Sequence, residues 1–93
     1  MRVKLLISYD GADFVGWQRQ PKGRSVQGEI ERALARLLGG MVSVQGAGRT
    51  DAGVHAMAQT ASFEAELNMP LERLSYALNN LLPLDVRVLA AGK

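Results

Sequence analysis

Cysteine is absent from this sequence of 93 residues. Disulfide bonds and thiolate metal sites are therefore excluded. Long hydrophobic runs are also absent, since no stretch reaches the roughly 18–20 apolar residues that a helix needs to cross a bilayer. The first residues lack the pattern of a secretory signal peptide. These absences lead us to expect a cytoplasmic protein.

Acidic residues are missing from one stretch of the chain, between Asp13 and Glu29. The basic residues of that stretch are Arg19, Lys22 and Arg24. Arg49 adds a positive charge to a second glycine-rich stretch. If the two stretches lie at one end of the fold, they form a basic rim that can bind phosphate groups. The alternative is ordinary solvated loop charge, because the net charge of the chain is only +2.

The spacing of apolar residues predicts six elements of secondary structure in one domain, residues 1–93. Alternation of apolar and polar residues indicates strands, and recurrence every three or four residues indicates amphipathic helices. The predicted elements are, in order, a strand over 1–10, a helix over 26–38, a strand over 41–45, a strand over 55–66, a helix over 70–82 and a strand over 85–90. This order predicts an α+β, ferredoxin-like β-α-β-β-α-β fold, with two helices on one face of a four-stranded antiparallel sheet.

Single residues mark where these elements begin and end. Ser25 is a plausible N-cap for the first helix, and Gly39 ends that helix because glycine readily adopts the left-handed conformation of a C-cap. Pro70 is predicted in the first turn of the second helix, and Pro83 stops it. Leu6 interrupts the polar face of the first strand, which predicts a central strand that is partly covered on both faces.

Several functional interpretations of this pattern are not favoured. RNA-recognition modules share the element order, but they stack bases on aromatic residues, and the third strand here offers only Phe63. Gly46-Ala47-Gly48 lacks the third glycine of a dinucleotide fingerprint. Asp51 and His55 are four residues apart, but without a third ligand nearby we predict no metal site. His55 is expected to have a structural or hydrogen-bonding role at the start of its strand.

Asp51 lies between two glycines and directly follows Arg49 and Thr50. Taken alone, it is interpreted as a turn aspartate that bonds its own backbone, which is a common use of this residue. The surrounding residues change that interpretation. Gly48–Ala56, which reads GRTDAGVHA, resembles the signature loop of the TruA family of tRNA pseudouridine synthases.

Three further blocks are similar to that family, and all occur in the family's order. They are Tyr9–Gln20, Ser25–Glu29 and Ala77–Val86. The resemblance covers nearly the whole chain and implies an isomerase that converts uridine to pseudouridine in the anticodon stem-loop of tRNA, without cofactor or metal. It also implies that Asp51 is the catalytic carboxylate, which either attacks C1′ of the ribose or takes the C2′ proton to give a glycal.

The resemblance also suggests which residues bind the RNA. The target uridine cannot react while it is stacked, so it must be flipped out at a cost of a few kcal/mol. Arg49 matches a family arginine that fills the vacated space and pairs with the aspartate. Thr50 and His55 belong to the same predicted site. The residues expected to contact the RNA backbone are Arg19, Lys22 and Arg24.

The chain departs from the family mainly in length, because family members carry a second, similarly folded half. We therefore expect an N-terminal catalytic-loop domain that is inactive, or nearly so, alone, and a homodimer for the full-length enzyme. An exposed edge strand in the isolated domain invites self-association. The alternative is a non-catalytic RNA-binding domain with a ferredoxin-like fold, which the basic residues favour but which gives no reason for the motif around Asp51.

Overall fold

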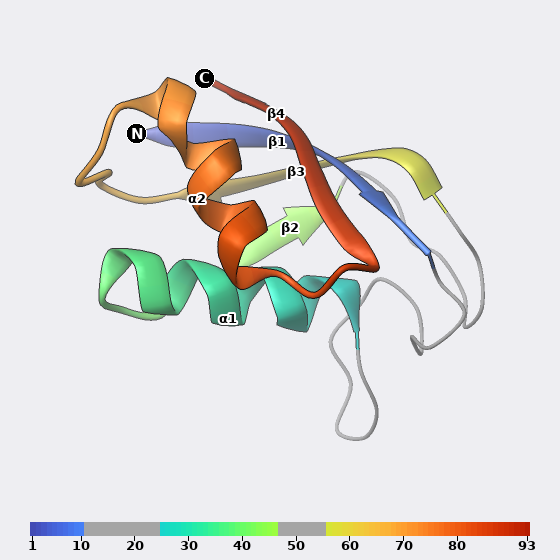
Figure 1. Cartoon of the computed structure of the whole chain (residues 1–93). Coiled ribbons are helices and arrows are strands. Elements are labelled where there is room, and N and C mark those ends of the chain that lie inside the picture. Colours follow the sequence, from blue (N-terminus) through green and yellow to red (C-terminus); the bar gives the residue numbers. More distant parts are fainter. Residues whose placement is uncertain (11–24, 47–55) are drawn as a thin grey trace.

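The computed structural model describes residues 1–10, 25–46 and 56–93, the last stretch with side chains from residue 59 onward. The described elements are β1 (Arg2–Tyr9), α1 (Val26–Leu38), β2 (Val44–Gly46), β3 (Ala56–Glu64), α2 (Leu74–Leu81) and β4 (Val86–Gly92), with a 3₁₀ turn, Leu71–Arg73, directly before α2. Figure 1 shows the strands as one sheet with α1 and α2 against it.

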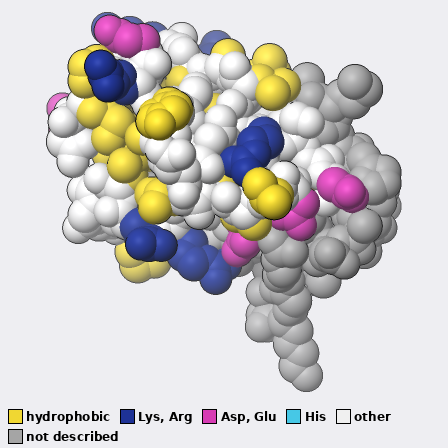
Figure 2. Space-filling model, viewed as in Figure 1, with side chains coloured by type: hydrophobic (Ala, Val, Ile, Leu, Met, Phe, Trp, Pro, Cys, Tyr) yellow, Lys and Arg dark blue, Asp and Glu magenta, His cyan; other side chains and the backbone are white. Residues whose placement is uncertain are grey.

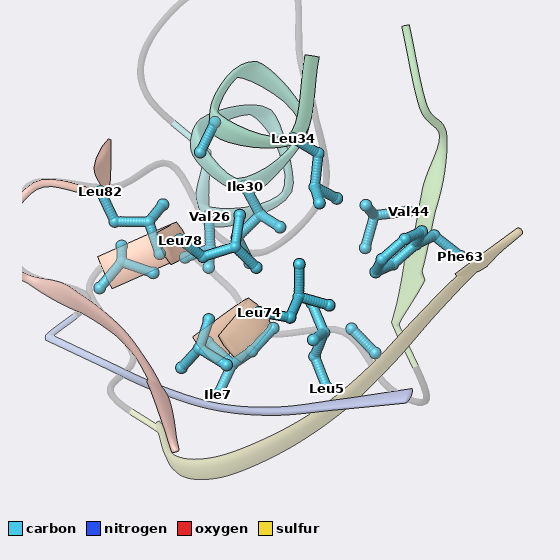
Figure 3. Close-up of a cluster of buried hydrophobic side chains, with 14 of the residues drawn as sticks. Leu5, Ile7, Val26, Ile30, Leu34, Val44, Phe63, Leu74, Leu78 and Leu82 are labelled. Atoms are coloured by element: carbon cyan, nitrogen blue, oxygen red, sulfur yellow. The ribbon is translucent and has the colours of Figure 1, made fainter. Parts of the chain in front are cut away.

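The strands form one antiparallel sheet in the order β2-β3-β1-β4. β1 lies between β3 and β4, which confirms the central strand that Leu6 predicted. Both helices pack on the same face of this sheet (Figure 3). This arrangement confirms the predicted α+β fold with two helices on one face of a four-stranded antiparallel sheet, and it is consistent with a ferredoxin-like arrangement.

The core lies between the helices and that face of the sheet. β1 alternates exposed and buried positions, so that Val3, Leu5 and Ile7 all point into the core. The helices contribute apolar residues at helical spacing, and the shorter strands complete the layer. The fully buried residues of these other elements include Val26, Ile30, Leu34, Val44, Phe63, Leu74 and Leu78 (Figure 3). Burial of these side chains is the main force that holds the helices on the sheet.

The predicted ends of α1 are confirmed. Ser25 is extended, and its Oγ accepts the backbone N–H of Gly28 at 3.0 Å, which satisfies a donor that the first turn would otherwise leave free. Gly39 has a φ of 78°, in the left-handed region, and its N–H donates to the Ala35 carbonyl oxygen at 3.0 Å.

Other predicted boundaries need correction. β2 begins at Val44 and not at Met41, because Val44 is the first of these residues that pairs with β3. Pro70 does not lie in the helix, since its ψ of 141° is extended and a 3₁₀ turn follows it. The last strand continues beyond residue 90, because Ala91 and Gly92 still pair with β1. The predicted start of the third strand, His55, lies outside the described residues.

Candidate functional site

The residues predicted to act on RNA fall in two segments, which we name the basic segment (residues 11–24) and the aspartate segment (residues 47–55). Neither segment belongs to the described residues. Outside the described part therefore lie Asp51, Arg49, Thr50, His55, Arg19, Lys22 and Arg24. Their roles stay predictions, and the structure describes the framework that borders them.

One border of the basic segment and one border of the aspartate segment lie at the same end of the sheet. Asp10 directly precedes the basic segment, and its backbone N–H donates to the Asp85 carbonyl oxygen at 3.0 Å. Tyr9, at the end of β1, is the register partner of Ala56, which directly follows the aspartate segment. The last residue of β1 and the first residue of β3 are therefore neighbours. This adjacency supports the prediction that both segments lie at one end of the fold.

The third border, at the end of β2, is tied to α1. The Glu31 carboxylate oxygen Oε2 accepts the backbone N–H of Val44 at 2.8 Å. The Gln27 side-chain amide donates from Nε2 to the Val44 carbonyl oxygen at 2.6 Å. Both polar backbone groups of one β2 residue are therefore bonded to side chains of the same helix, and the aspartate segment begins three residues later. Sequence reasoning missed Gln27 and Glu31 as anchors.

A similar attachment joins α2 to β4. The Asn79 side chain accepts the Val88 N–H at 2.8 Å and donates to the Val88 carbonyl oxygen at 3.0 Å. Arg87 of β4 forms a third bond between these elements, because its Nη1 donates to the Asn79 carbonyl oxygen at 2.8 Å near the end of α2. That carbonyl belongs to the last turn of the helix, where backbone acceptors need partners from outside the helix. α2 and β4 are therefore fixed to each other by polar bonds as well as by packing.

Polar side chains of three strands are hydrogen-bonded to one another on the face of the sheet that the helices leave uncovered. Arg2, on β1, donates from Nη2 to Ser62 Oγ on β3 at 3.1 Å and to Gln45 Oε1 on β2 at 2.5 Å. One guanidinium thus links three neighbouring strands across this face. A shallow hollow farther along the face includes Lys4, Leu6 and other residues of β1, β3 and β4 in its lining. No carboxylate or imidazole is among the residues that line it.

The helix side carries interspersed charges of both signs (Figure 2). A notch between α1 and the residues after α2 is lined by Glu29, Arg32, Arg36, Leu81 and Pro83, among others. Arg32 pairs with Glu29 at 2.6 Å within this notch. Its positive charge is therefore partly neutralised, and the notch does not have the character of a strong anion site.

Titration shifts in the described residues occur away from the segment borders. The amino terminus of Met1 donates a hydrogen bond to the Glu64 carboxylate, which raises the pKa of the amino terminus and lowers the pKa of the Glu64 carboxyl. The two groups are 2.8 Å apart at the opposite end of β1 from Asp10. These shifts reflect a surface ion pair and give no indication of catalytic chemistry.

Residues 1–10, 25–46 and 56–93 contain no group of three or more His, Cys, Asp or Glu that could hold a metal ion. Within those same ranges, no helix has the length and apolar character needed to cross a membrane.

Comparison with known proteins gives the family. The sequence profile of a family described as tRNA pseudouridine synthase matches residues 5–93. The chain is 48% identical over 89 residues to tRNA pseudouridine synthase A of Thermodesulfovibrio yellowstonii, which covers 96% of this chain and 35% of that protein. It is 54% identical over 87 residues to the protein of the same name from Chlorobaculum tepidum, with 92% of this chain and 35% of that protein covered. It is 53% identical over 91 residues to the protein of the same name from Synechococcus, with 98% of this chain and 31% of that protein covered. The chain spans about a third of the length of these curated relatives.

Proposed function

This chain belongs to the tRNA pseudouridine synthase family, and from that premise we propose that the protein isomerises uridine to pseudouridine in the anticodon stem-loop of tRNA. The observation that carries the proposal is the match over residues 5–93, which includes the GRTDAGVHA sequence around Asp51. We also propose a cytoplasmic location, where its tRNA substrate would be available.

Asp51 supplies the catalytic carboxylate in this proposal. The bond between N1 of the base and C1′ of the ribose breaks, the base turns in place, and a bond forms between C5 and C1′. The C5 hydrogen leaves as a proton, and N1 gains a proton, so that the product is an isomer of the substrate. The carboxylate either attacks C1′ or removes the C2′ proton to give a glycal. The adjacency of Tyr9 and Ala56 supports a site at this end of the sheet, because it brings a border of the basic segment beside a border of the aspartate segment.

The other predicted site residues bind and hold the flipped nucleotide. Arg49 fills the space that the uridine vacates, because a planar guanidinium can both stack on bases and bind phosphate. Thr50 and His55 complete the aspartate segment's contribution. The basic segment contributes phosphate contacts, from Arg19, Lys22 and Arg24. Because such contacts release counterions, tRNA affinity should fall as salt is added.

The proposal assigns full activity to a longer protein than these 93 residues. Since the chain spans about a third of the length of its curated relatives, we propose that a second half completes the cleft and that the whole enzyme is a homodimer. A site held from one side loses the positioning that provides much of an enzyme's acceleration. The chain alone is therefore expected to be inactive or nearly so.

The test is release of the C5 hydrogen from tRNA that carries labelled uridine. We expect release when the chain is extended to its relatives' length or mixed with the second half, and little or none from the chain alone. Asp51→Asn should abolish release while tRNA still binds. Glu72→Gln is the matched control, because it also removes one carboxylate but lies exposed on the 3₁₀ turn. Appreciable release by Asp51→Asn would remove Asp51 from its proposed role.

The same experiment decides on the alternative function. A non-catalytic RNA-binding domain would bind tRNA with a steep salt dependence and release no C5 hydrogen in any of these arrangements. That result would contradict the proposed isomerase activity.

A further inference from the structure

β2 is an edge strand of the described sheet. It has three residues and lies at the sheet edge, where β3 is its only neighbour. An edge strand presents a row of backbone groups that no strand satisfies on its outer side. The described residues of β2 pair with β3, and the aspartate segment follows them directly in the sequence.

Two side chains of α1 replace the missing neighbour at Val44. Glu31 accepts the Val44 N–H at 2.8 Å, and Gln27 donates to the Val44 carbonyl oxygen at 2.6 Å. Gln27 and Glu31 are four residues apart, which places them on one face of the helix. Only 8% of Glu31 is exposed. A carboxylate that accepts a backbone N–H makes a stronger bond than a neutral acceptor does, and strength increases where water is excluded.

Apolar packing also fixes Val44, through its side chain. Val44 is fully buried and is the register partner of Phe63 on β3. Figure 3 shows the Val44 side chain directed between Leu34 of α1 and Phe63. The position of Val44 is therefore determined by α1 through both polar and apolar contacts.

α1 also borders the basic segment. Its N-cap, Ser25, is the first described residue after that segment, and Gln27 and Glu31 lie in the next two turns. The same end of one helix is thus joined in sequence to the basic segment and by hydrogen bonds to the strand before the aspartate segment. Asp51 follows Val44 by only seven residues.

We propose that Gln27 and Glu31 are positioning residues, which hold β2 in place so that the aspartate segment presents Asp51 to the ribose. The inference rests on the proposed function. It assigns these two residues an effect on the rate of the chemical step and not on tRNA affinity. The competing explanation is that they only satisfy the backbone hydrogen-bonding groups of an edge strand, as Asn79 does for Val88 at the opposite edge of the sheet.

Asn79 provides the matched control, because it makes the same two backbone bonds at the opposite edge. The variants are Glu31→Ala, Glu31→Gln and Asn79→Ala, made in the form of the protein that releases C5 hydrogen. The measurements are the single-turnover rate of release, the Kd for tRNA and the melting temperature. Glu31→Gln retains an acceptor oxygen for the Val44 N–H and should recover most of the rate.

Glu31→Ala should slow the single-turnover rate by about 10- to 100-fold while the Kd stays within about twofold, because a small misplacement of a catalytic group has large kinetic effects. Both alanine variants should lower the melting temperature by about 5 °C or more. Asn79→Ala should keep the wild-type rate. If Glu31→Ala does not fold, Gln27→Ala removes only the second bond and should slow the rate in the same direction.

Equal loss of rate in Glu31→Ala and Asn79→Ala at equal loss of stability would overturn the inference, and so would a wild-type rate in both Glu31→Ala and Gln27→Ala. Either result leaves the proposed function intact if the wild-type protein releases hydrogen and Asp51→Asn does not. Absence of release from the wild-type protein would contradict the proposed function itself.

Discussion

At both edges of the sheet, helix side chains form hydrogen bonds with the backbone of the edge strand. At the β2 edge, Gln27 and Glu31 of α1 bond the carbonyl and the N–H of Val44. At the β4 edge, one side chain of α2, Asn79, bonds both groups of Val88. In each case a helix side chain occupies the position where a further strand would pair.

The difference lies in how much else holds each strand. Six of the seven residues of β4 pair with the central strand, whereas in the described part of the chain three residues of β2 pair with β3. Loss of the side-chain bonds should therefore displace β2 more than β4. Similar bonds can therefore contribute unequally, since Asn79 adds to the pairing of β4 with β1, whereas we expect Glu31 to provide much of the attachment of β2.

Self-association of the isolated domain through an exposed sheet edge stays a prediction. The helix side chains bonded to Val44 and Val88 would hinder such pairing. A strand from another copy would have to displace a helix side chain at Val44 or at Val88. Within the part of the chain that the structure describes, the helix side-chain bonds to β4 are made at Val88, and Leu89, the next residue, is 53% exposed. If the isolated domain associates, we expect the new pairing to begin at this end of β4.

The largest effect is expected from the residue opposite Val44. Phe63→Ala should lower the free energy of unfolding by about 3–5 kcal/mol, because it removes a fully buried ring between β2 and the core. Urea unfolding measures the change. Leu78→Ala, a buried residue of α2 beside the other edge, is the control and should cost a comparable amount. A loss below about 1 kcal/mol for Phe63→Ala would show that the β2 edge is not packed as described.

The next effect isolates the polar bonds at the β4 edge. Asn79→Asp keeps the acceptor for the Val88 N–H but places a second oxygen against the Val88 carbonyl. It should cost about 1–3 kcal/mol at neutral pH, because the carbonyl loses its donor. The cost should shrink on acidification, when the introduced carboxyl gains a proton that it can donate. Asn80→Asp, at the exposed neighbouring position, should change stability little at either pH.

A smaller effect is expected at the start of α1, where the two helices also differ. Ser25 caps α1 through the Gly28 N–H, while α2 begins without a side-chain cap. Ser25→Ala should therefore cost about 1 kcal/mol, measured by thermal or urea unfolding. Ser43→Ala, at an exposed serine just before β2, is the control. Equal small effects of both variants would mean that the cap adds nothing to α1.

The smallest effect concerns the ion pair between Glu64 and the amino terminus, which is exposed to solvent. The lowered pKa of Glu64 gives stability that is lost as pH falls through the folded-state value, and the raised pKa of the amino terminus gives stability that is lost as pH rises through its own. Glu64→Gln should thus differ from wild type mainly between the ordinary values of 4.5 and 8.0. Added salt should remove the difference. A difference that persists at high salt would contradict this explanation.

The sequence predicted the parts of the fold that follow from local pattern. Alternation in β1 and helical spacing in α1 were sufficient for those elements, and Ser25 and Gly39 marked the ends of α1 because capping is a local property. The short β2 was misplaced, because strand length there depends on pairing with β3. The second helix was predicted to begin at Pro70, but Pro70 is extended and a 3₁₀ turn separates it from α2. The local sequence is compatible with both conformations.

For the candidate site, too, the sequence predicted some features and not others. Its family and its motif residues were identifiable from the sequence, and the family is confirmed. The geometry of Asp51 was not accessible to that reasoning, and this residue lies outside the described part of the chain. The anchors were missed because Glu31 and Gln27 resemble ordinary polar residues of a surface helix. Only the tertiary position of β2, which is set by long-range pairing, makes them partners of Val44.

Amide hydrogen exchange at Val44 and Val88, followed by NMR, tests the two-edge comparison most directly. We predict that both amides are protected although they point away from neighbouring strands, and that Glu31→Ala accelerates exchange at Val44 while Val88 keeps its wild-type rate. Exchange of the wild-type Val44 amide at the rate of an unprotected amide would contradict the account, because Glu31 would then not hold β2 in solution.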